Sequence, residues 1–329
     1  MELIANNQPQ QMILDVSDVE PKSGTNFIEA NTKSVTIQHL KNDCVIPVFA
    51  KDNESTISHF QFIDAVHDLV KQQFQGEIIN RPEIRVSHVV KGRIPSAIGK
   101  PAKELLEHEK TLYFERCAFV IEIPSVTENV NRNPLTLTVG GVRSYSEQNL
   151  YSRKTLEKFK VFIGFKNMIC LNLCICTDGY SDNIRIASID ELQNQLNDVI
   201  FNYKKEKHLG MLEKMSKYNL KEKQFAHLIG KLRMFQHLPK QEMVNLPLVT
   251  LNDSQVNHIV KDYYNCPNFG RNEDGSLNLW NLYNLMTEAN KSSYIDNNFQ
   301  RSVNVYELIN KLGNSIENNS YDWLLPNVI

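Results

Sequence analysis

The chain has 329 residues, 41% hydrophobic and 22% charged, a balance that excludes a disordered chain and a mini-protein held together by disulfides. No run of 18 apolar residues and no signal-like N-terminus is present, so we expect a cytoplasmic protein without membrane contact. The net charge of −2 divides unevenly, because residues 81–240 carry 26 Lys and Arg against 17 Asp and Glu, whereas the remainder carries 10 against 21. This asymmetry is typical either of a polyanion-binding surface or of an ordinary solvated one.

The front half of the chain has the periodicity of one helix followed by strands. The first 40 residues are polar and rich in Asn and Gln, which predicts a flexible N-terminal arm. Residues 45–49 suit a short strand, and apolar residues from Ile57 to Phe74 then recur at helical spacing before Gly76. Alternating apolar residues predict further strands at 84–90, 112–124, 135–145, 159–165 and 168–176.

After residue 187 the signals become helical. Ser188 with Glu191 has the form of a capping box, and Asn219 with Glu222 predicts a second helix start. Further helices are expected at 253–264, 278–290 and 303–312, the last one closed by Gly313. The predicted fold is therefore α+β, with an N-terminal helix packed on an antiparallel β-meander in a sheet domain at 41–187, followed by a helical region at 188–329.

Familiar catalytic motifs are missing from the chain. It contains no phosphate loop, no G-x-G-x-x-G, no G-x-S-x-G and no H-E-x-x-H, so we expect no nucleotide cofactor and leave open whether the protein is an enzyme. No C-x-x-C pair or metal-spaced histidine pair is present, and no metal site is predicted. The group Cys170, Cys174 and Cys176 favours core packing over metal binding, since free cysteines are among the most buried residues.

A basic loop between the first two strands after the helix is the best candidate for a binding site. Within residues 81–103, only Glu83 opposes the cations, and such clusters attract phosphates because each neutralised phosphate releases counterions. Further lysines at 154–166 and 204–207, and aromatic residues such as Tyr113 and Phe114, would suit single-stranded nucleic acid, although solubilising edge lysines and core aromatics are the favoured interpretation of most of them. We assign candidate nucleic-acid contacts to Arg81, Arg85, His88, Lys91, Arg93, Lys100 and Lys103.

Four segments together resemble a known family. They are RVSH at 85–88, LTLTVGG at 135–141, FKVFIGFKNMICLNLCI at 159–175 and NLWNLYNLMTEANKSSYID at 278–296. They are similar to an uncharacterised family of phage- and plasmid-borne proteins, a domain of unknown function found on prophages and conjugative elements of gut anaerobes, and the resemblance spans residues 27–325. Besides His88, the family motif contains residues without known roles, namely Asn167, Cys170, Asn172, Trp280, Asn284 and Thr287.

Trp280, Asn284 and Thr287 fall on one face of a predicted helix, where a structural tie to the sheet is favoured over a functional contact. The resemblance implies a mobile-element context rather than an activity. Such elements encode single-strand annealing proteins, whose order of helix, strands and helices is similar at a coarse level. The leading hypothesis is a DNA-handling protein that binds single-stranded DNA in recombination or replication, as a monomer or a homo-oligomer. The alternatives are a metal-dependent nuclease or hydrolase using His88, and a module that binds a host protein.

Overall fold

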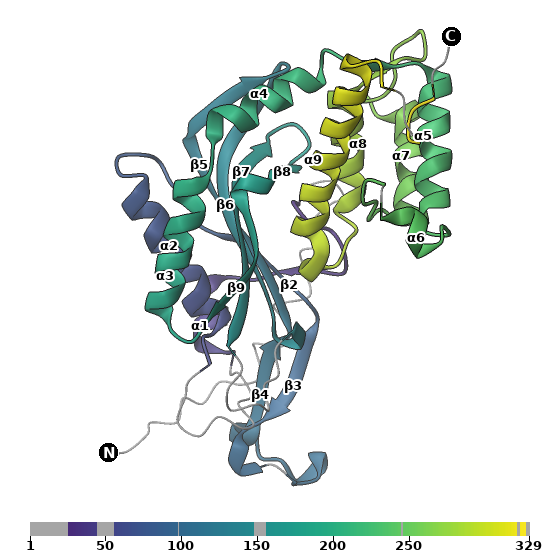
Figure 1. The fold of residues 1–329 in the computed structure, drawn as a ribbon. Helices are drawn as coiled ribbons and strands as arrows, with labels where there is room; N and C mark the ends of the chain where they lie inside the picture. Colours follow the sequence, from purple (N-terminus) through teal and green to yellow (C-terminus); the bar gives the residue numbers. More distant parts are fainter. Residues whose placement is uncertain are drawn as a thin grey trace.

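The computed structural model describes residues 26–44, 56–97, 99–147, 156–244, 246–320 and 323–326. An antiparallel sheet lies at the centre of these residues, with helices on both of its faces (Figure 1). The coarse expectation of a mixed α and β protein built on an antiparallel sheet is thereby confirmed. The predicted strand at 45–49 and the first 25 residues of the predicted N-terminal arm lie outside the described residues.

The central sheet is connected mainly as a meander. Its strands lie in the order β1-β2-β5-β6-β7-β8, and β9 also pairs with β7. Asn131 and Arg132, which join β5 to β6, both have positive φ angles (50° and 65°), as a two-residue hairpin turn that matches the strand twist requires. The strands are β1 (Lys33–Ser34), β2 (Glu83–Val86), β5 (Arg116–Val130), β6 (Asn133–Ser144), β7 (Glu157–Asn167), β8 (Leu173–Cys174) and β9 (Tyr180–Ile186).

Several helices of the described chain begin at a residue whose side chain accepts a hydrogen bond from the first turn. Ser188 caps α3 by accepting a hydrogen bond from the Glu191 N–H, which confirms this predicted start. Asn219 does not start a helix, because it pairs with Asn278 in the two-stranded antiparallel sheet of β10 (Asn219–Leu220) and β11 (Leu277–Asn278). The helices are α1 (Ile37–Asn42), α2 (His59–Gln73), α3 (Ile189–Asn202), α4 (Lys205–Met215), α5 (Glu222–Phe235), α6 (Lys240–Met243), α7 (Asp253–Asn265), α8 (Leu279–Asn290) and α9 (Ile295–Glu317).

Alternate residues of the sheet face two different layers of helices (Figure 1). Phe119 of β5 packs against α2, where its ring lies edge-on to Phe62 with 5.2 Å between the ring centroids. Ala118 and Val120, on either side of it, belong instead to the apolar cluster that includes Phe299 of α9. The two-residue period of a strand therefore gives each face of the sheet its own core.

Helix α9 is longer than the helix predicted at 303–312, since it runs from Ile295 to Glu317 and passes through Gly313. A Cβ at Gly313 would lie 3.5 Å from side-chain atoms of Leu279 and Tyr218. The missing side chain thus leaves room for close packing against α8. Because tertiary contacts override the weak helix propensity of glycine here, Gly313 does not end the helix.

Two predicted strands are each divided in the structure. The strand expected at 84–90 is split into β2 and β3 by Ser87 and His88, and the strand expected at 112–124 is split into β4 and β5 at Glu115. The strand expected at 168–176 shortens to β8, because residues 168–172 form a turn in which Leu171 has a φ of 59°. Strand periodicity locates apolar residues but does not show where a pair of strands leaves a sheet.

The described part of the predicted N-terminal arm, residues 26–40, packs on the body of the protein. Phe27 and Ile28 are buried in the cluster under α9. The N–H groups of Glu29 and Ala30 both donate to the carbonyl of Lys291, at 2.9 and 3.3 Å. Buried apolar area and backbone hydrogen bonds therefore fix this segment, in contrast to the flexible arm that its composition predicts.

Candidate nucleic-acid interface

A two-stranded ribbon projects from one end of the sheet (Figure 1). It consists of β3 (Val89–Arg93) and β4 (Lys110–Phe114), which pair antiparallel from Val89 opposite Phe114 to Arg93 opposite Lys110. Residues 94–109 form its tip, which contains 3₁₀ turns at 95–97, 102–104 and 107–109. We call residues 89–114 the arm; this segment is separate from the predicted N-terminal arm.

The base of the arm is fixed to the body by backbone groups. Ser87 N–H donates to the Arg116 carbonyl (3.0 Å), and Arg116 N–H donates back to the Ser87 hydroxyl (3.1 Å). The buried His59 ring donates from Nε2 to the carbonyl of Phe114 (2.8 Å), whose side chain is also buried. These bonds cross the break between the two sheets, so the arm leaves the body in a defined direction.

One face of the arm carries a row of cations. Residues that pair across an antiparallel ribbon share a face, and residues two apart on one strand do so as well. Lys91, Arg93 and Lys110 therefore lie on the same face, with Arg93 directly opposite Lys110. Lys110 was not among the candidates predicted from the sequence. The register of β3 against β4 is the signal that would have added it.

The tip balances part of this charge. Lys100 forms an ion pair with Glu109, and Lys110 forms one with Glu107 at 2.5 Å. The hydrogen bonds from Lys100 and from the Leu106 N–H lower the pKa of Glu109, so this carboxylate stays ionised. Across residues 89–114 five Lys and Arg oppose three Glu, which leaves the arm at +2, with Lys91, Arg93 and Lys103 making no ion pair to a carboxylate of the described chain.

The remaining predicted contacts lie at or below the base of the arm. Arg81 and His88 are exposed, before β2 and between β2 and β3 respectively. Arg85 is only 4% exposed, and its guanidinium donates to the hydroxyl and the carbonyl of Thr32, both at 2.9 Å. Because its donors are used inside the protein, Arg85 anchors the N-terminal segment and lies outside the exposed cation row.

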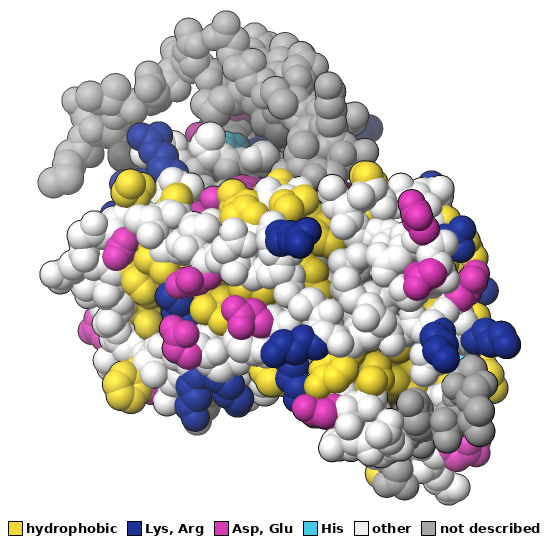
Figure 2. Space-filling view, turned by 90° about the horizontal axis from the view of Figure 1, so that it is seen from above, with side chains coloured by type: hydrophobic (Ala, Val, Ile, Leu, Met, Phe, Trp, Pro, Cys, Tyr) yellow, Lys and Arg dark blue, Asp and Glu magenta, His cyan; other side chains and the backbone are white. Residues whose placement is uncertain are grey.

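The other lysine groups are mostly engaged in ion pairs. Lys166 is buried between Glu83 and Glu122 at 3.0 and 2.7 Å, and Lys160 binds Glu147 at 2.6 Å. Lys205 and Lys207 pair with Glu128 and Asp178. Figure 2, which views the molecule from the end opposite the arm, shows Lys and Arg interspersed with Asp and Glu on that face. Charges of both signs in this arrangement form no concentrated polyanion site.

The family-motif residues converge on Asn284 of α8. Its side-chain oxygen accepts from Asn167 Nδ2 (2.9 Å) and from the Cys170 thiol (3.4 Å), and its backbone carbonyl accepts from Asn172 Nδ2 (3.0 Å). Asn284 Nδ2 and the Thr287 hydroxyl donate to carbonyls one turn earlier on their own helix. Asn167, Asn172 and Asn284 are all at most 1% exposed. We call this set the amide cluster.

The chemistry of the amide cluster is that of a structural tie. Burial raises the pKa of the Cys170 thiol to about 12, so the sulfur stays protonated and does not act as a nucleophile. Buried Lys291 extends the cluster, because its Nζ donates to the Cys170 carbonyl (2.5 Å) and pairs with Glu288 (2.9 Å). Trp280, also from the family motif, is buried on the same helix. These bonds join the turn after β7 to α8, which agrees with the structural role favoured from the sequence.

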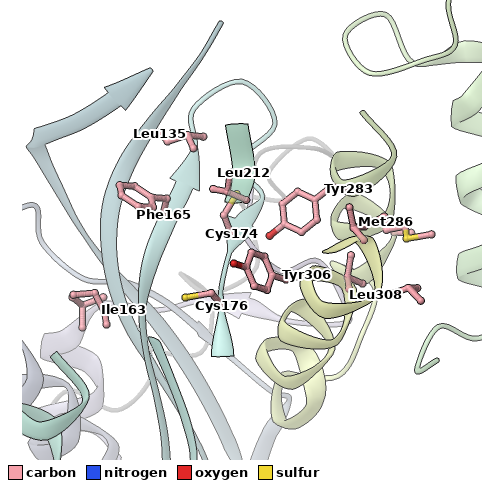
Figure 3. Packing of buried hydrophobic residues seen from close by; sticks show 14 of the residues in the cluster. Leu135, Ile163, Phe165, Cys174, Cys176, Leu212, Tyr283, Met286, Tyr306 and Leu308 are labelled. Atoms are coloured by element: carbon pink, nitrogen blue, oxygen red, sulfur yellow. The ribbon is translucent and has the colours of Figure 1, made fainter. Parts of the chain in front are cut away.

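A second buried polar group lies between β8 and the helices. Figure 3 shows the rings of Tyr283 and Tyr306 between α8, α9 and the thiols of Cys174 and Cys176. Burial raises the pKa of both thiols, that of Cys176 to about 11, and both therefore stay protonated. Cys174 and Cys176 thus serve the core, as their spacing on a strand favoured.

Two histidines are buried beside aromatic rings. His208 is hydrogen-bonded through Nδ1 to the Tyr203 hydroxyl (2.9 Å), and burial lowers its pKa to about 3. His59 lies 4.5 Å from the Tyr145 ring, and burial, aided by the nearby Arg143 charge, lowers its pKa to about 3 as well. Arg143 is itself paired with Glu157. Both histidines are neutral at physiological pH, and neither is exposed to a ligand.

Within the described residues, one small depression of about 10 Å³ lies between α4, α8 and α9 beside Tyr218 and Gly313, and it is large enough for a single water molecule. The described chain holds no group of three or more His, Cys, Asp or Glu arranged to bind a metal. His88, which the nuclease alternative would use, stands on an exposed segment at the base of the arm. In the part of the chain that the structure covers, no helix is long and apolar enough to cross a membrane.

The fold and the site together define a mixed α and β protein with a central antiparallel sheet and a projecting basic arm. Over residues 8–325 the chain matches the family model described as "Domain of unknown function, B. Theta Gene description (DUF3871)", and it belongs to that family. Comparison with curated proteins gives no match. Comparison with solved structures likewise gives none.

Proposed function

We propose that this protein binds DNA through the arm and serves a mobile genetic element. The observation that carries the proposal is the row of Lys91, Arg93 and Lys110 on one face of a ribbon that projects from the body. The mobile-element setting is supported by the resemblance of the four motif segments to phage- and plasmid-borne proteins. DNA handling in recombination or replication, including annealing, is the class of role that this setting favours.

The exposed charges of the arm suit phosphate contact. Lys91 and Lys103 are exposed and Arg93 is half-buried, and none of the three is paired with a carboxylate of the described chain. Each neutralised phosphate changes the slope of log K against log salt by about −0.9 on duplex DNA. Three such contacts therefore predict that affinity falls about 40-fold between about 50 and 200 mM salt.

The test is a binding titration with labelled DNA at two salt concentrations. The arm variant Lys91→Gln, Arg93→Gln, Lys103→Gln removes three cations that form no ion pair with a carboxylate of the described chain; of the three, the Arg93 guanidinium donates a hydrogen bond to the Lys100 carbonyl. The matched control, Lys217→Gln, Lys223→Gln, Arg233→Gln, removes three exposed cations from the helical part of the chain. Loss of affinity in the arm variant alone supports the proposal, whereas equal loss in both variants, or absence of binding at low salt, would overturn it.

A further inference from the structure

The composition of the arm limits the form of DNA that it can hold. Residues 89–112 contain no Phe, Tyr or Trp. Phe114 at the base is buried and has its carbonyl bound by His59, and Tyr113 lies edge-on to Tyr145 with 6.3 Å between ring centroids. Proteins that hold single strands without sequence preference stack bases on aromatic side chains. The projecting part of the arm offers no such platform.

The shape of the arm suits a groove. Two paired strands lie about 4.8 Å apart, and the five residue pairs of β3 and β4 span about 14 Å before the tip begins. The major groove of B-form DNA is about 12 Å wide and admits a two-stranded β-ribbon. Lys91 and Arg93 are separated by about 6.8 Å along one strand, so they can reach successive positions on the backbone that borders the groove.

The tip is built to keep its shape during such insertion. Its backbone is tied by hydrogen bonds from Ile94 N–H to the Glu109 carbonyl (3.0 Å) and from Ala97 N–H to the Ile94 carbonyl (3.0 Å). Ala97 is fully buried, and the carboxylate of Glu109 accepts from the Leu106 N–H. A preorganised element loses little conformational freedom when it binds, so little binding free energy is needed to order the arm in a groove.

We infer that the ligand of the arm is double-stranded B-form DNA, with the ribbon in the major groove and its cations on the flanking phosphates. This inference rests on the proposed function, and it narrows that function to a duplex substrate. Double-stranded RNA is disfavoured because the major groove of an A-form helix is deep and narrow. Single-stranded DNA is disfavoured because the arm provides charge without stacking.

The experiment compares three kinds of ligand with one sequence: the DNA duplex, its two separated strands, and the RNA duplex. The wild-type protein should bind the DNA duplex about tenfold or more tightly than the separated strands or the RNA duplex. The arm variant should lose this preference, and the control variant should keep it. Methylation of guanine N7, which lies in the major groove, should interfere with duplex binding by the wild-type protein.

The outcomes separate the two proposals. Binding of single strands at least as tightly as the duplex, lost in the arm variant, would leave the arm as the DNA-binding element and overturn its assignment to duplex DNA. Duplex binding that is insensitive to N7 methylation would overturn the placement in the major groove. Binding of no nucleic acid at low salt would overturn the proposed function itself.

Discussion

The arm and the amide cluster both contain polar residues, and the structure gives the two groups opposite surroundings. Lys91 and Lys103 stand exposed on the arm without a carboxylate partner in the described chain, whereas Asn167 and Asn284 are buried and bonded to each other. An exposed cation contributes little to the folded state and much to the encounter with a polyanion. A buried amide does the reverse, because its loss leaves a partner unsatisfied. Binding and stability should therefore respond to different substitutions.

The largest expected effect is a loss of stability at acidic pH, and it arises from two buried histidines. His59 and His208 have a pKa of about 3 in the folded protein, below the ordinary value of 6.5, so the unfolded chain binds more protons as pH falls below 6.5. The stability that both residues contribute is complete above pH 6.5 and is lost as pH falls toward 3. At about pH 5 the loss is about 2 kcal/mol for each histidine.

Urea unfolding of the wild type at neutral and at mildly acidic pH measures this loss. His59→Gln and His208→Gln, singly and together, should flatten the dependence of the unfolding free energy on pH. An identical pH dependence in the wild type and the double variant would contradict the assignment. Folded molecules keep both buried histidines neutral over this range, so DNA affinity per folded molecule should not fall with the stability.

The next largest effect is expected from Asn284→Ala, which removes the centre of the amide cluster. Asn167 Nδ2 and the Cys170 thiol lose their acceptor inside the protein, and a lost buried partner costs about 1–3 kcal/mol. We expect a destabilisation of about 3 kcal/mol in denaturant unfolding, with unchanged affinity for DNA. Asn314→Ala, at an exposed position on α9, is the control and should change stability by less than about 0.5 kcal/mol. Equal losses of stability at both positions would contradict the role of the amide cluster as a structural tie.

The arm variant Lys91→Gln, Arg93→Gln, Lys103→Gln is expected to show the opposite pattern. The slope of log K against log salt should decrease in magnitude by about 2.7, which corresponds to about 2 kcal/mol between about 50 and 200 mM salt. Its unfolding free energy should stay within about 1 kcal/mol of the wild type, since Lys91 and Lys103 are exposed and half-buried Arg93 loses one hydrogen bond, to the Lys100 carbonyl. A loss of stability comparable to that of Asn284→Ala would show that the arm is part of the folded core.

The smallest expected effect comes from comparing Arg85 of β2 with Lys91 of β3, two basic residues close together in the sequence. Arg85→Gln removes two hydrogen bonds to Thr32 and should lower stability by about 1.5 kcal/mol without reducing DNA affinity. Lys91→Gln should reduce affinity and leave stability unchanged. Thermal unfolding and DNA titration of both variants provide the measurement, and a loss of affinity in Arg85→Gln equal to that in Lys91→Gln would place Arg85 in the binding surface after all.

Periodicity and capping chemistry were sufficient for much of the local structure. The helical spacing of Ile63, Val66 and Val70 buries one face of α2, and Ser188 begins α3, as expected from residues close together in sequence. Alternation likewise located the strands that became β6 and β7. These features depend on contacts between near neighbours or on a single buried face, which is information that a short window of sequence contains.

Tertiary structure alone decided the features on which function depends. The break at Ser87 and His88 turns two long predicted strands into a sheet and an arm, because a hydrogen-bond pattern between segments far apart in sequence ends there. The burial of Arg85 follows from Thr32 lying beside it, and the amide cluster joins Asn167 to Asn284 across 117 positions. Residue type and spacing specify which side chains need a partner, but only the packed chain determines which partner each one meets.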